Sequence, residues 1–125
     1  MGWPTLDMGT FRSMQHWDLL SVDAARGTRD PYVVHQDDGA RAVLIVLAPG
    51  QELGEHQVKE HAWVSVIEGR VQVAAGAELV ELGQGALVRF EAGERHALSS
   101  AGGARILLLL SPWPGEGHYP PGEGS

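Results

Sequence analysis

The stretch PGQELGEHQVKEHAWVSVIEGRVQV, from Pro49 to Val73, decides the fold. It places histidines and glutamates ahead of an apolar strand predicted to begin at Ala62, and glycine turns interrupt it. An all-β fold brings such loop residues to the mouth of a barrel, where they can meet a ligand. The stretch therefore predicts both a strand scaffold and part of a binding site.

Short strand-like runs separated by glycine turns extend on both sides of this stretch. Seventeen glycines and seven prolines in 125 residues favour strands and turns over helices, so helix is expected to be scarce. Asp38-Gly39 is a strong hairpin signal, and the segment from Gly50 to His61 is interpreted as a loop. Strands are predicted at 17–22, 31–36, 41–47, 62–68, 70–74, 78–82, 86–90 and 105–110.

The length predicts a single domain with a core of its own. Residues 1–15 are weakly patterned and are interpreted as an N-terminal arm, and residues 16–110 as the barrel domain. Residues 111–125 form a tail so rich in proline and glycine that no regular element is expected there.

Charge and composition restrict the partners. The net charge is −7 without any cluster of Lys or Arg, which argues against nucleic acid and against an anionic membrane surface. The longest wholly apolar run, residues 42–48, is too short to span a bilayer, and the first thirteen residues do not resemble a secretory signal. The lack of cysteine leaves the compartment open but is consistent with a cytoplasm, and a soluble cytoplasmic protein is the default expectation.

Two glycine and histidine patterns share a common spacing. In the first, five residues separate Gly50 from His56, and Gly69 follows the next strand; in the second, five residues separate Gly85 from Glu91, before Gly93 and His96. This arrangement resembles the paired motifs of the cupin family, G-x5-H-x-H-x3-4-E-x6-G and G-x5-P-x-G-x2-H-x3-N. The resemblance implies an all-β double-stranded β-helix, or jelly-roll barrel, with a metal site inside.

The chain departs from these motifs at four positions. Val58 stands where the family usually has a second histidine, and Ala62 where it has the ligand glutamate. Glu91 and Ser100 replace the proline and the asparagine of the second motif, which are structural positions. Two of the four usual metal ligands are therefore missing from their places.

Neighbouring residues offer substitutes for the missing ligands. His56 and His96, with Glu60 or His61, would supply three nitrogen or oxygen donors and open positions, a set that suits Zn, Fe, Mn, Ni or Cu. A group of small bacterial cupins that the chain resembles has the same HxxxE spacing, which favours Glu60 over His61. In the alternative, His56 and His96 line a polar cavity that binds no metal.

Three functions stay open at this point. The barrel is a metal-dependent enzyme acting on a small polar molecule, a small-ligand binding or sensor module without catalysis, or a structural protein whose sheet faces serve a partner. No catalytic residue is assigned, because no triad of the Ser-His-Asp type and no nucleotide-binding pattern is readable. Small single-domain cupins resembling this chain usually pair, so a homodimer is expected.

Overall fold

The computed structural model describes residues 14–24, 32–56 and 58–114, with only the backbone of residues 54–56. Most of the expected arm and residues 115–125 of the expected tail lie outside these ranges. The described part holds strands and turns without any helix, as the glycine-rich sequence predicts. No helix of the described residues is long and apolar enough to cross a membrane.

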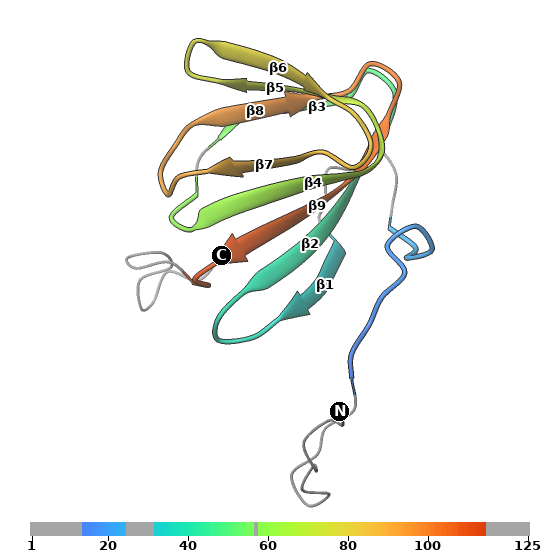
Figure 1. Cartoon of the computed structure of the whole chain (residues 1–125), viewed down its shortest axis with the longest axis vertical. Helices are drawn as coiled ribbons and strands as arrows, with labels where there is room; N and C mark the ends of the chain where they lie inside the picture. Colours follow the sequence, from blue (N-terminus) through green and yellow to red (C-terminus); the bar gives the residue numbers. More distant parts are fainter. Residues whose placement is uncertain (1–13, 25–31, 57, 115–125) are drawn as a thin grey trace, which may run out of the picture.

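The described residues form nine antiparallel strands in two sheets that face each other (Figure 1). The five-stranded sheet has the order β1-β2-β9-β4-β7 and the four-stranded sheet the order β3-β8-β5-β6. The strands are β1 (Tyr32–Gln36), β2 (Arg41–Leu47), β3 (Glu52–His56), β4 (His61–Gly69), β5 (Val71–Ala75), β6 (Glu78–Leu82), β7 (Leu87–Phe90), β8 (His96–Ser99) and β9 (Ala104–Ser111). This is the double-stranded β-helix, so the predicted all-β jelly-roll class is confirmed.

The core fills the space between the two sheets. Alternate residues of each strand point inward, as the period of two requires, and buried residues come from both sheets. They include Val64, Val66, Ile106, Val71, Val73 and Leu98, each at most 3% exposed. The opposite faces of β4 and β5 carry more exposed residues such as Trp63 and Gln72.

Strand β2 is buried on both of its faces. All five residues from Val43 to Leu47 are buried, although only alternate ones can point into the barrel. On the outer face, Arg105 of β9 donates hydrogen bonds to the carbonyl oxygens of Leu19 and Val22, at 3.1 and 3.0 Å. Segment 14–24 therefore lies against the outer face of the five-stranded sheet.

The strand predicted at residues 17–22 is wrong, because that segment forms a turn. The Asp18 carboxylate accepts hydrogen bonds from the Leu20 N–H and the Ser21 hydroxyl, at 3.1 and 2.9 Å. The Ser21 N–H also bonds the Asp18 carbonyl oxygen at 2.9 Å. Local side-chain hydrogen bonds of this kind compete with strand pairing, and they hold the pKa of Asp18 below its ordinary value.

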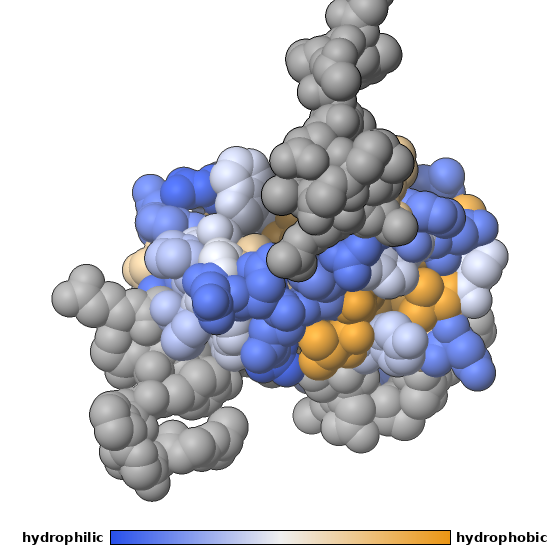
Figure 2. All heavy atoms as spheres, turned by 90° about the horizontal axis from the view of Figure 1, so that it is seen from below, coloured by the Kyte–Doolittle hydropathy of each residue, from blue (hydrophilic) through white to orange (hydrophobic). Residues whose placement is uncertain are grey.

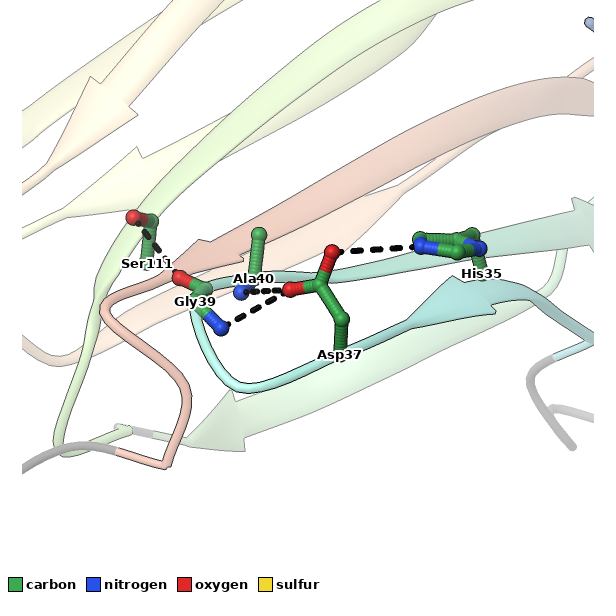
Figure 3. A network of polar contacts seen from close by, with 5 residues as sticks. All are labelled: His35, Asp37, Gly39, Ala40 and Ser111. Atoms are coloured by element: carbon green, nitrogen blue, oxygen red, sulfur yellow. Dashed lines mark hydrogen bonds and ion pairs between the residues drawn. The ribbon is translucent and has the colours of Figure 1, made fainter. Parts of the chain in front are cut away.

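A tight hairpin joins β1 to β2 at the predicted Asp38-Gly39 signal, and Asp37 holds it together (Figure 3). One Asp37 oxygen accepts the N–H groups of Gly39 and Ala40 at 2.8 and 3.0 Å, and the other lies 3.2 Å from His35 Nε2. These bonds, the Gly39 bond foremost, lower the pKa of Asp37. The Gly39 carbonyl oxygen in turn accepts the Ser111 hydroxyl, which ties the end of β9 to the hairpin.

Candidate functional site

The two motif segments meet at one end of the barrel. Strand β3 pairs with β8 in a register that makes His56 and His96 backbone partners. The loop between β7 and β8 touches the loop between β3 and β4, where the Gly93 N–H donates to the Val58 carbonyl oxygen at 2.7 Å. Two segments far apart in sequence thus form one region of the molecule.

His96 begins β8 and is only 2% exposed. Its Nδ1 lies 3.1 Å from the carbonyl oxygen of Glu94, so Nδ1 must carry the proton that this bond uses. In the neutral ring, the lone pair then belongs to Nε2. A backbone carbonyl that fixes the tautomer in this way is typical of histidines that bind a metal ion or accept a proton.

An aromatic ring holds the imidazole of His96 in place. Phe90, the last residue of β7, stacks on it with ring centroids 4.0 Å apart and planes only 6° from parallel. Phe90 is itself 2% exposed. Because β7 belongs to the five-stranded sheet and β8 to the four-stranded one, the stack also joins the two sheets.

Glu60 and His61 occupy different environments although they are neighbours in sequence. Glu60 lies in the bend before β4 and is fully buried, at 0% exposed. His61 starts β4 on the outward side of the alternation, with a side chain that is 41% exposed. Its Nδ1 lies 3.2 Å from Glu91 Oε2 without hydrogen-bond geometry, so the contact becomes an ion pair when His61 is protonated. Of the two, Glu60 has the position of an interior donor.

The positions of the missing family ligands are apolar. Ala62 is 0% exposed and is the register partner of Phe90. Val58 is half-buried and packs against the hydrophobic core. The wall of the site beside His96 is therefore hydrocarbon and aromatic, which leaves the polar chemistry to few groups.

The donors available to a metal ion are few among the described side chains. No group of three or more His, Asp or Glu side chains with suitable spacing occurs there. The side chain of His56 lies outside the described residues, so it is not among these donors. Glu60 and His96 are the buried donors of the expected set, and His61 is directed toward Glu91 at the surface.

The sequence did not single out two parts of this site. For Phe90, its place before the glycine-containing loop of the second motif is the only sequence signal of its contact with His96. The carbonyl oxygen of Glu94 has no sequence signal, because every residue carries a backbone carbonyl. The departures at Glu91 and Ser100 are both accommodated: Glu91 accepts a hydrogen bond from Arg89 at 3.0 Å, and the Ser100 hydroxyl donates to the Arg70 carbonyl at 2.6 Å.

Comparison with known families matches residues 43–111 to the cupin domain. The chain belongs to the cupin family. The matched range begins in β2 and ends with the last residue of β9, so it includes both motif segments of this cupin. A comparison with curated proteins finds no match.

Solved structures with the same fold are numerous. The protein TT1209 from Thermus thermophilus is 27% identical, with a TM-score of 0.70 over 79% of this cupin and 98% of that chain. An RmlC-like cupin from Desulfovibrio desulfuricans is 20% identical, with a TM-score of 0.71 over 80% and 98% of the two chains. Bacillus subtilis oxalate decarboxylase, described by its Mn(II) centers, is 26% identical over 62% of this cupin and 22% of its own chain, with a TM-score of 0.58.

Proposed function

We propose that this cupin binds a divalent metal ion through His56, Glu60 and His96 and uses it to bind a small polar molecule. The observation that carries the proposal is the complete burial of the Glu60 carboxylate at the barrel end where His96 is also buried. A carboxylate and an imidazole that are both buried at one end of a barrel are donors that a divalent ion binds readily. The expected alternative donor, His61, is less suitable because it faces Glu91.

The chemistry of the donors fits a first-row divalent ion. One carboxylate and neutral imidazoles suit Zn, Fe, Mn, Ni or Cu. The hydrogen bond from His96 Nδ1 to the Glu94 carbonyl keeps the Nε2 lone pair available for coordination, and the Phe90 stack fixes the ring plane. The Mn(II) centers of the similar oxalate decarboxylase support an ion of this class. A bound ion would supply Lewis acidity to an oxygen atom of the small molecule.

The residues around His96 define what such a site accepts. The walls at Ala62 and Phe90 are apolar and both residues are essentially inaccessible to water. Water exclusion strengthens the electrostatic attraction between the buried Glu60 carboxylate and any cation. A small ligand with one or two oxygen donors and a compact apolar remainder matches these walls.

Metal analysis of the purified protein tests the proposal. We expect close to one equivalent of metal by inductively coupled plasma mass spectrometry, and its loss in His96→Ala, Glu60→Gln and His56→Ala. His16→Ala is the matched control, because His16 is exposed and lies far along the chain from the motifs. Folding of each variant is checked by circular dichroism.

Two results would contradict the metal proposal. If the protein stays metal-free after reconstitution with each of Zn, Fe, Mn, Ni and Cu, the metal-free ligand-binding module is the remaining candidate function. The apolar residues at Val58 and Ala62 favour that alternative. Full metal content in His96→Ala, or in both Glu60→Gln and His61→Ala, would show that the metal lies elsewhere. Metal loss in His61→Ala, with full metal content in Glu60→Gln, would identify His61 as the third ligand in place of Glu60.

We also propose that the chain forms a homodimer through the outer face of the five-stranded sheet. Trp63 of β4 and Leu109 of β9 are register partners on this face, and each is 37% exposed. Leu87 of β7, on the same face, is 60% exposed. Figure 2 shows that apolar side chains gather into patches between hydrophilic residues on the side of the molecule seen from below. Contiguous exposed apolar surface of this kind is typical of association sites.

Light scattering after size-exclusion chromatography tests the dimer. We expect twice the chain mass for the native protein and a monomer for Leu109→Glu. Leu79→Glu is the matched control, since Leu79 is exposed on the other sheet. A clean monomer of the native protein would refute the homodimer.

A further inference from the structure

The outer face of the four-stranded sheet carries a groove that is separate from the barrel interior. A cavity of about 500 Å³ lies where β4 passes into β5, and a second of about 260 Å³ lies farther along the same sheet. Gln72 and Ser99 line both, so the two are parts of one groove. The sheet is the upper one in Figure 1.

A row of polar side chains crosses this groove. Successive register partners bring together one residue from each of the four strands: Glu52, Ser99, Gln72 and Glu81. The neighbours of Gln72 in β5, Val71 and Val73, are buried in the core, so the row points away from the barrel. Antiparallel partners of this kind lie about 5 Å apart, which matches the spacing of functional groups on a small molecule.

An ion pair closes one end of the row. Arg70 donates from Nε and Nη2 to a single oxygen of Glu81, at 3.1 and 2.7 Å, and both side chains are more than half exposed. The pair neutralises itself, yet it presents a donor and an acceptor side by side. Its position is fixed from below, because the buried Ser100 hydroxyl donates to the Arg70 carbonyl oxygen at 2.6 Å.

The other part of the groove has an apolar floor. Ala74 and Ala97 are register partners whose small side chains lower the surface, and Leu79 stands beside them. The groove thus offers hydrogen-bonding groups along one side and hydrocarbon along the other. Molecules with hydroxyl groups around a C–H face have the complementary distribution.

We propose that this groove binds a small neutral polyhydroxylated molecule, a monosaccharide or a polyol. Each hydroxyl both donates and accepts, so it can use the Gln72 amide, the Ser99 hydroxyl and the paired charges of Arg70 and Glu81. Arg70 and Glu81 neutralise each other, so the pair offers a charged ligand little net attraction, and Glu52 in the same row would repel an anion. A neutral ligand uses the hydrogen-bonding groups without this repulsion.

Titration by heteronuclear NMR with named probes tests this site. The probes are D-glucose, D-galactose, D-mannose and sorbitol, with glucuronate and glucosamine as charged counterparts. We expect at least one neutral probe to bind in the millimolar range and to shift amide resonances of β5, β6 and β8. A response to sorbitol as strong as to the sugars would identify an open-chain polyol, and a weaker one a sugar ring; both support the proposal.

Two variants tie the binding to the groove. Gln72→Ala should weaken it about tenfold, as loss of about one strong hydrogen bond implies, and Ala97→Leu should weaken it by filling the floor. Gln36→Ala, an exposed strand glutamine on the other sheet, should bind as the native protein does. Absence of any response, unchanged binding by Gln72→Ala, or tighter binding of glucuronate or glucosamine would overturn the proposal. The titration does not depend on bound metal, so failure of this proposal can be distinguished from failure of the metal proposal.

Discussion

The two sheets of this cupin differ in what covers their outer faces. The five-stranded sheet is apolar on both sides at β2, and segment 14–24 lies against it through Arg105. The four-stranded sheet buries its apolar side chains mainly toward the barrel, and its outer face carries the polar row that includes Gln72 and Ser99. The five-stranded sheet therefore packs side chains on both of its faces at β2, whereas the four-stranded sheet leaves its outer face available to ligands.

The largest effect on stability is expected from truncating one core residue in each sheet. Ile106→Ala in the five-stranded sheet should lower the free energy of unfolding by about 4 kcal/mol, because the side chain is fully buried between two paired strands. Leu98→Ala in β8 should cost less, about 2 kcal/mol, because Leu98 borders the open groove, where the structure can relax. Urea denaturation measures both values. An equal or larger effect of Leu98→Ala would break the comparison.

A substitution in the connection between the two sheets is expected to lower the stability nearly as much. Gly69 ends β4 with a φ of +88°, and a Cβ there would lie 2.4 Å from the Gly103 carbonyl oxygen, so Gly69→Ala should cost about 3 kcal/mol. Gly76→Ala is the matched control: its φ is +60° but no atom lies within 4 Å, so only the backbone strain of about 1 kcal/mol remains. Thermal denaturation of both variants gives the difference. Equal losses would mean that the close approach of residues 69 and 103 does not matter.

The stack of Phe90 on His96 across the two sheets should contribute less to the free energy of unfolding. Phe90→Leu keeps much of the buried apolar volume but removes the ring against His96, so we expect a loss of about 1 kcal/mol. The NMR resonances of the His96 ring should also shift, because the ring current of Phe90 disappears. Unchanged His96 resonances would show that the two rings are not stacked in solution.

The smallest effect concerns the hairpin at the edge of the five-stranded sheet. Hydrogen bonds from Gly39 and Ala40, and then from His35, lower the pKa of Asp37 in the folded protein. A lowered pKa contributes stability above the ordinary value of 3.8, and this contribution is lost as the pH falls through the lower folded pKa. Asp37→Asn should therefore flatten the acid side of the curve of melting temperature against pH. Asp38→Asn, an exposed neighbour in the same turn, is the control, and an identical curve for native and Asp37→Asn proteins would argue against the bonds.

Strands were predicted correctly in both sheets, but the strands that were missed belong to one sheet only. The predicted bounds at 41–47 and 78–82 match β2 and β6, and the other matched strands differ by one residue at one or both ends. Strands β3 and β8 were missed, and both belong to the four-stranded sheet. Each has only four or five residues with polar ones among them, so neither has the apolar run that marks β2. The two missed strands carry His56 and His96, which is why the site was placed in loops.

The candidate site was predicted in part for a related reason. The paired glycine and histidine spacing was enough to identify the family and to bring residues near 56 and 96 together. The ranking of Glu60 above His61 rested on the HxxxE spacing, and the burial of Glu60 agrees with it. The groove of Gln72 and Ser99 had no sequence signal, because its residues come from four strands and join only through register.

The sequence by itself determined the strand and turn alternation, the cupin family and the absence of polar ligands at Val58 and Ala62. These follow from local properties: the two-residue period, glycine turns and motif spacing. Only the tertiary structure decided that Glu60 is buried while His61 faces Glu91, that Phe90 stacks on His96, and that the four-stranded sheet has an open polar row. Such features depend on which strands pair and in what register, and pairing between distant segments is a property of the whole packed chain.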